Sequence, residues 1–262
     1  MIMQRQQGFT LPEAIMVIVI TGIIAGVVAV FIRAPMQSYF DMETRVELTD
    51  TADTALRRIG RDLRLALPNS ARVSGNIVLE LLQTRTGGRY VASLLGGSVL
   101  DYTGTSFNVL PGSMPIAPVA GDSVVIYNLG QGIPGADAYA GDNIAPIKSV
   151  GTNAITLTTA FDFPLDSPGR RFQVVESPVT YLCDLTAGTL RRYWGYAINA
   201  TQPNPPSGGN TQSALLAQGV TGCAFTYDAV SERMGLVTLT LSLTRNNETV
   251  TLYHEVHVNN VP

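Results

Sequence analysis

The chain has 262 residues, a formal net charge of −3 and 14% charged residues, whereas soluble domains average about 25%. The acidic balance, with Lys148 as the single lysine, gives no sign of nucleic-acid binding. This length allows one sizeable hydrophobic core beyond any anchor.

The N-terminal region contains a long apolar run. Residues 14–32 carry no charge, and nineteen helical residues at about 1.5 Å each nearly match a ~30 Å hydrocarbon core. Residues 1–7 precede it with Arg5, so the positive-inside tendency keeps this leader cytoplasmic and sends the C-terminal body outward. We therefore expect a transmembrane helix over residues 9–34.

A carboxylate at the start of this run is unexpected, because acidic side chains are costly in lipid. Glu13 lies five residues after Gly8, and residues 8–13 read GFTLPE. This pattern resembles the signal of the type IV prepilin-like superfamily. A secretory signal or a simple membrane anchor is the alternative, but a secretory signal has a shorter apolar core and a cleavage site after it, and an anchor does not explain Glu13.

The resemblance implies several roles. A prepilin peptidase would cut between Gly8 and Phe9 and methylate the new N-terminus of Phe9. Glu13 would act as an assembly charge that meets the amine of Phe9, within one chain or in a neighbouring subunit. Pro12 departs from the usual aliphatic residue, but the first turn of a helix beginning at Phe9 tolerates it, although Leu11 is then disfavoured in helical dihedrals.

Two glycines, Gly22 and Gly26, have the G-x-x-x-G spacing within the apolar run. This spacing permits close helix packing in membranes, although glycine is also common in membrane helices generally.

An amphipathic helix is predicted to continue the first one over residues 35–67, with a kink at Pro35 and an end at residues 68–70. Its predicted apolar face consists of Val46, Thr49, Ala52, Leu56, Ile59, Leu63 and Ala66. The rest of its surface carries Arg45, Glu47, Asp50, Arg57, Arg58, Arg61 and Arg64. Because Asp53 and Asp62 lie among the arginines, this surface is expected to face solvent or a subunit.

The remainder, residues 71–262, reads as a β-rich globular body. Strands are predicted over residues 77–82, 124–128, 154–158, 172–175, 179–183 and 190–194. Residues 236–244 alternate apolar and hydroxyl side chains and form a predicted hairpin with residues 249–258. Residues 203–210 read as a loop. The expected fold class is α+β and type IV pilin-like: a long transmembrane and amphipathic helix packed on an antiparallel sheet.

Cys183 and Cys223 are the two cysteines. In an oxidising compartment we expect a disulfide between them, with two buried free thiols as the alternative.

The C-terminal third extends the resemblance. The segments VTYLC (179–183), LRR (190–192), ALL (214–216) and CAFTY (223–227), followed by the strand at 236–243, have an order similar to minor pilins of the MSHA pilus. The J-type minor pseudopilins of type II secretion match less well. Residues 71–170 align with neither.

An enzyme is not predicted. His254 and His257 lack the H-E-x-x-H spacing and would point to opposite faces of a strand. No cofactor or metal is expected; the acidic turns with Asp137, Asp142 and Asn143, and with Asp162 and Asp166, are read as turn formers, with calcium ligation as the alternative.

The resemblance therefore implies a minor pilin-like subunit with a priming or tip role. Its partners would be the prepilin peptidase, other major and minor pilins and the assembly platform. It would await assembly in the bacterial inner membrane with a periplasmic body, then enter a pilus or pseudopilus. There are two alternatives: a type II secretion pseudopilin, and a membrane-anchored periplasmic binding protein or adhesin that never polymerises.

Overall fold

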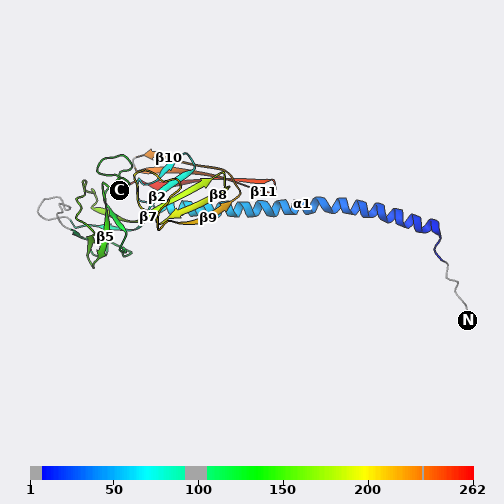
Figure 1. Ribbon diagram of the computed structural model, residues 1–262, viewed down its shortest axis with the longest axis horizontal. Helices are drawn as coiled ribbons and strands as arrows, with labels where there is room; N and C mark the ends of the chain where they lie inside the picture. The colour runs from blue at the N-terminus through cyan, green and yellow to red at the C-terminus, as the bar shows by residue number, and fades with distance from the viewer. Residues whose placement is uncertain (1–7, 92–104, 232) are drawn as a thin grey trace, which may run out of the picture.

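The computed structural model describes residues 8–91, 105–231 and 233–262, so the predicted cleaved leader, residues 1–8, lies outside the described residues except for Gly8. A single helix, α1 (Leu11–Arg64), runs for 54 residues. Its first half projects from a β-rich body, and its second half lies along that body (Figure 1). This is the predicted α+β layout.

The helix passes through Pro35 without interruption. Figure 1 shows a gentle curve and no sharp kink, so the expected kink at this residue is absent. A proline inside a helix removes one N–H bond and costs roughly 3 kcal/mol. The remaining backbone bonds on either side keep one continuous rod.

The helix ends at Arg64, three residues earlier than predicted. The reason is a competing strand partner: Leu67 N–H donates to Leu82 O (2.8 Å), and Thr84 N–H donates to Leu65 O (2.8 Å). Residues 65–67 therefore leave the helix to pair with strand β2.

The body contains two antiparallel sheets. The larger has nine strands, in the order β1-β2-β7-β4-β5-β6-β3, with β8 and β9 added beside β7. Their bounds are β1 (Arg72–Ser74), β2 (Val78–Arg89), β3 (Ser106–Asn108), β4 (Ser123–Val125), β5 (Ile144–Val150), β6 (Ala154–Leu157), β7 (Arg171–Asp184), β8 (Thr189–Trp194) and β9 (Gln212–Gln218). The smaller consists of β10 (Val220–Ser231), β11 (Met234–Arg245) and β12 (Glu248–Asn259).

The hairpin β11–β12 matches its prediction closely. Arg245 pairs with Glu248 across the turn, and Asn246 and Asn247 have φ values of 51° and 64°. Two consecutive residues with positive φ make the turn whose twist suits a two-residue hairpin, and asparagine tolerates this conformation. Along β11, buried and half-buried residues alternate as the sequence predicted.

Other strands differ from their predictions. Residues 172–175 and 179–183 belong to one 14-residue strand, β7, which continues through Pro178. Strands β9 and β10 were not predicted. Both are weakly patterned: β10 forms a hairpin with the strand that follows it, β11, and β9 pairs with β8 across the loop at residues 195–211.

The main core lies between the second half of α1 and the two sheets. The buried helix positions are Thr44, Leu48, Ala52, Ala55, Leu56, Ile59, Gly60, Leu63 and, unexpectedly, the charged Asp62. The predicted face was wrong at its N-terminal end: Val46 is 64% exposed and Thr49 is exposed. A second apolar core, around Phe107, Ile155 and Phe172, lies under β3, β5 and β6.

Candidate processing and assembly site

The predicted processing site lies just before the helix begins. Thr10 is the N-cap residue, with extended dihedrals (φ −87°, ψ 150°), and its carbonyl accepts bonds from the N–H groups of Glu13 and Ala14, both at 3.1 Å. Gly8 and Phe9 precede the helix and are exposed. An exposed, non-helical peptide bond between Gly8 and Phe9 is accessible to a peptidase.

Pro12 occupies the first turn of α1. Its missing N–H is one of the four that have no partner inside a helix, so the proline removes no helical bond. The helix begins at Leu11 rather than Phe9, and Leu11 is helical despite the proline that follows it. The two-residue shift places Phe9 outside the helix of the unprocessed chain.

Glu13 is the acidic residue of the first helical turn, and its side chain is exposed. Among the described residues, no hydrogen bond or ion pair to its carboxylate is recorded. A carboxylate here interacts favourably with the positive end of the helix dipole, typically by ~0.3–1 kcal/mol. Its charge otherwise remains available to another molecule or to an N-terminal amine created by cleavage.

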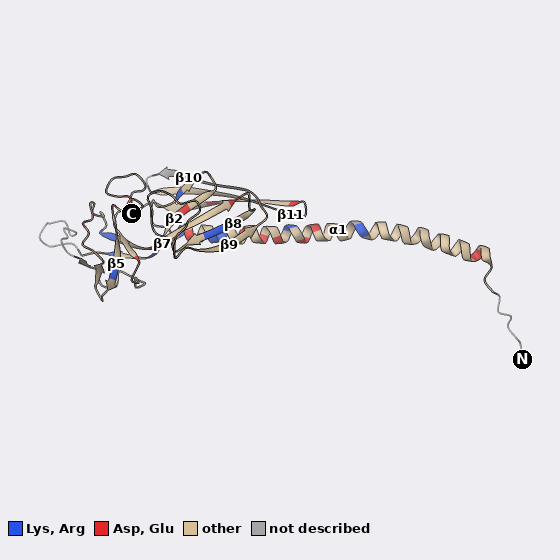
Figure 2. Ribbon diagram, viewed as in Figure 1, with Lys and Arg blue, Asp and Glu red and all other residues tan. Residues whose placement is uncertain are grey.

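The apolar half of α1 is exposed at nearly every position that the structure describes. Among the described residues, α1 is the one helix long and apolar enough to cross a membrane, and its most apolar stretch is fully exposed. In Figure 2 the projecting helix is uncharged between a red position near its start and a blue position near its middle. Such a surface is unstable in water and requires lipid or apolar partners.

Gly22 and Gly26 lie on this free segment. A Cβ atom built on either glycine would meet nothing within 4 Å. The chain itself therefore gives no reason for a small residue at these positions, and any packing role must involve another molecule.

The body holds the other half of the helix through a buried charge. Asp62 of α1 is 1% exposed; its carboxylate accepts hydrogen bonds from Tyr181 Oη (2.6 Å) and Arg192 Nε (2.8 Å), which come from β7 and β8. Burial lowers the pKa of Arg192, but the hydrogen bond and charge of Asp62 outweigh it, so the net pKa is raised. Burial and Asp62 both raise the pKa of Tyr181. The hydrogen bonds from Tyr181 and Arg192 to Asp62 fix the helix to the larger sheet.

The smaller sheet holds the helix through two exposed ion pairs. At the tip of the β11–β12 hairpin, Glu248 pairs with Arg45 and Arg245 pairs with Glu47. The hydrogen bond and charge of Arg245 lower the pKa of the Glu47 carboxyl. The two helix residues lie two positions apart, so the hairpin tip meets α1 where it emerges from the body.

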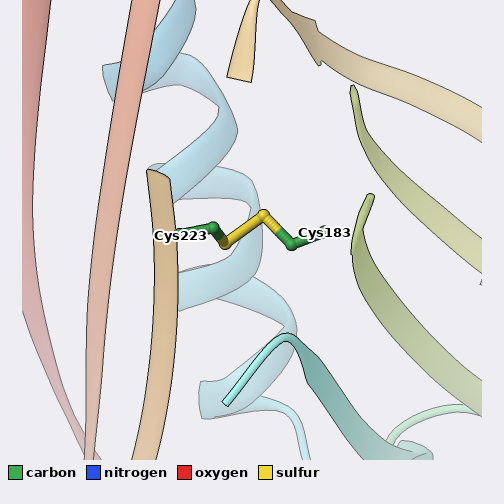
Figure 3. Close-up of a disulfide and its surroundings, with 2 residues drawn as sticks. All are labelled: Cys183 and Cys223. Carbon is green, nitrogen blue, oxygen red and sulfur yellow. A yellow bond between two sulfur atoms is a disulfide. The ribbon is translucent and has the colours of Figure 1, made fainter. Parts of the chain in front are cut away.

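The disulfide between Cys183 and Cys223 joins the two sheets. Figure 3 shows it beside α1, running from β7 to β10. It encloses residues 203–210, the predicted loop, which lies between β8 and β9.

One comparison with known proteins gives a match. Residues 3–29 match the prokaryotic N-terminal methylation motif. This is a type IV prepilin-like N-terminus. Proteins with this motif are typically structural rather than catalytic, and the motif implies processing by a prepilin peptidase and assembly with other pilins. No curated protein and no solved structure matches the chain.

Asp137 and Asp142, two of the residues weighed as metal ligands, have local roles. The carboxylate of Asp137 accepts hydrogen bonds from the N–H groups of Tyr139 (2.9 Å) and Gly132 (2.8 Å). The carboxylate of Asp142 accepts one from the N–H group of Gly135 (3.0 Å). These bonds shape turns. Within residues 8–91, 105–231 and 233–262, no group of three or more metal-binding side chains is found.

Sequence reasoning missed Asp62 as the residue that attaches the helix to the sheet. It lay within a run of arginines that favoured solvent exposure. The signal available was its position one residue before Leu63 and three after Ile59, on the edge of the apolar stripe.

Proposed function

We propose that this protein is a minor pilin-like subunit of an MSHA-like type IV pilus, similar to MshO, with a priming or tip role. One observation carries the proposal: a methylation motif leads into an apolar half-helix that its own body leaves uncovered. Membrane lipid would cover this half-helix before assembly and the helices of other subunits would cover it afterwards. The second core enlarges the body, and a bulky body suits a filament end better than a regular shaft.

Processing is the first step of this function. We infer cleavage between Gly8 and Phe9, with methylation of the new Phe9 amine, and retention of residues 9–34 as the membrane segment of a body that faces the periplasm. Residues 35–67 and 71–262 would then stay outside the bilayer. Mass spectrometry of protein extracted from membranes tests this order. A mature N-terminus after residue 32 would overturn it in favour of ordinary secretion.

Glu13 would act next. After cleavage, the Phe9 amine is a cation near lipid and Glu13 an anion, and each offsets the desolvation of the other when they pair. Glu13→Gln keeps the side-chain shape and removes the charge. We expect normal processing and insertion but weaker incorporation into purified filaments.

Arg33→Gln is the matched control, because it removes a charge from the same helix outside the first turn. It should assemble as the wild type does. Equal incorporation of Glu13→Gln and wild type would overturn the role of Glu13 as an assembly charge.

Two other functions fit the same precursor. A minor pseudopilin of a type II secretion system would use the same N-terminus, and pilus or secretion genes beside this one would distinguish the two. A membrane-anchored periplasmic binding protein or adhesin would never enter filaments. Absence of the protein from sheared filaments, together with its full retention in the membrane, would favour this function.

A further inference from the structure

A cavity of about 950 Å³ lies where the two sheets meet, beyond the C-terminal end of α1. Its lining comes from residues 69–73 after the helix, from two loops of the larger sheet, and from the end of the smaller sheet. The last residues of the chain line it, and Figure 1 places the C-terminus on the side of the body far from the apolar helix. Its size is typical of a small-molecule site.

The cavity wall combines tyrosine rings with amide side chains. Tyr127, Tyr139 and Tyr227 supply the rings, and Asn69 and Asn260 supply amides. Tyrosines offer an apolar face and a polar tip, while amides both donate and accept hydrogen bonds. This mixture suits a ligand with an apolar ring face and several hydroxyl groups.

Hydrogen-bonding capacity remains unused at this wall. Asn260 Nδ2 donates to Tyr227 Oη (3.0 Å), which leaves the hydroxyl hydrogen of Tyr227 for another acceptor. Asn260 is 3% exposed and its Oδ1 is without a hydrogen-bond partner among the described residues. Buried polar atoms in this state are rare and call for an explanation.

The backbone of Tyr127 is also unusual. Its φ is 54°, a conformation that bulky residues seldom adopt and that the surrounding structure must enforce. Strain of this kind concentrates at ligand sites, where it fixes a side chain in place.

Basic side chains outnumber acidic ones at the cavity, which the C-terminal residue Pro262 also lines. Arg72, Arg171 and Arg233 line it, and no aspartate or glutamate side chain does so among the described residues. Arg72 is neutralised by Glu80 at 2.7 Å and stacks on the ring of Tyr139 (3.6 Å from guanidinium carbon to ring centre). Arg171 is exposed, and no ion pair of its side chain is recorded among the described residues. An exposed guanidinium binds a carboxylate through two parallel hydrogen bonds.

We propose that this cavity binds a sugar acid, a polyhydroxylated ring bearing a carboxylate, either free or at the end of a glycan. Arg171 binds the carboxylate, Tyr227 and the Asn260 amide bind hydroxyl groups, and a tyrosine ring covers the apolar face of the sugar. The proposal concerns the body alone and holds whether or not the chain enters a filament.

Calorimetry on the full chain in detergent micelles tests it, with glucuronic, galacturonic and N-acetylneuraminic acids as probes at millimolar concentration. Glucose, galactose and the methyl ester of N-acetylneuraminic acid are the respective neutral counterparts. We expect at least one acid to bind and its neutral counterpart to bind about tenfold or more weakly, as loss of a charged hydrogen bond implies. Comparing the affinity for the free acid with the affinity for a glycan that ends in the same acid shows which of the two forms the cavity prefers. Absence of binding by all three acids would overturn the proposal.

Arg171→Gln should weaken binding of the acid about tenfold and leave binding of the neutral sugar unchanged. Arg61→Gln, which removes an exposed charge from α1, is the control and should change neither. Tyr227→Phe should weaken both ligands, since it removes a hydroxyl and no charge. Thermal unfolding of each variant identifies any loss of fold. Equal affinity of wild type and a folded Arg171→Gln variant for the acid would contradict the assignment.

Discussion

Cys183 and Cys223 link strand β7 of the larger sheet to strand β10 of the smaller one, with their Cα atoms 6.4 Å apart. They are 40 residues apart in sequence. Among the described residues the two sheets share no strand ladder, so this bond joins them covalently beside the packing around α1 and backbone hydrogen bonds such as that from Phe225 N–H to Asn76 O (2.8 Å).

Replacing both cysteines by serine should therefore destabilise the body. In the chain-entropy treatment, a bond closing a loop of about forty residues contributes on the order of 4 kcal/mol. Urea unfolding of wild type and double variant, in the same detergent, measures the difference. The wild type under reducing agent is the control and should lose a similar amount. An unchanged midpoint would mean that the noncovalent contacts hold the sheets together without the disulfide.

The ion pair between Asp62 and Arg192 should be far more sensitive than an exposed pair on the same helix. Asp62→Asn leaves a buried guanidinium without its counter-charge, which typically costs ~3–5 kcal/mol. Asp53, whose pair with Arg57 is exposed, provides the control, and Asp53→Asn should cost far less than Asp62→Asn. Denaturant unfolding of both variants compares them. Similar losses would show that Asp62 does not anchor the helix.

The free glycines should matter only between molecules. Gly22→Ala and Gly26→Ala place a methyl group in open space, so the unfolding of the isolated subunit should be unchanged. If these glycines pack against neighbouring helices, incorporation into filaments should fall. Gly235→Ala is the opposite case: its Cβ would lie 2.6 Å from the ring of Tyr227, so it should destabilise the body whether or not assembly occurs. Normal filament incorporation of both N-terminal variants would exclude close packing at these positions.

The pair between Glu47 and Arg245 should give the body a small stability dependence on pH. The pKa of Glu47 is lowered below its ordinary value of 4.5 in the folded protein. Its contribution to stability is therefore complete above about pH 4.5, the unfolded value, and is lost as the pH falls through the lowered pKa. NMR titration of the Glu47 carboxyl should find this pKa restored toward 4.5 in Arg245→Gln and unchanged in Arg57→Gln. Because the pair is exposed, salt should reduce the shift.

Much of the protein was predictable from local pattern. The apolar composition of residues 14–32 suits a helix in lipid, whatever the rest of the chain does. The residues that give the GFTLPE segment its chemistry are adjacent in sequence. The β11–β12 hairpin was equally local, since alternation along 236–244 and the Asn246-Asn247 turn determine its register. These features depend on residues within a few positions of one another.

Tertiary structure decided the rest. Helix α1 ends at Arg64 because residues 65–67 find a partner in β2, and Asp62 is buried because Tyr181 and Arg192 approach it from strands more than a hundred residues away. The apolar face begins at Thr44 and Leu48 rather than Val46 because the hairpin tip sets where the body meets the helix. Likewise the cavity gathers Asn69, Tyr127, Arg171 and Asn260 from four separate segments. A local pattern contains no information on such pairings, because their energies come from groups that only the fold brings together.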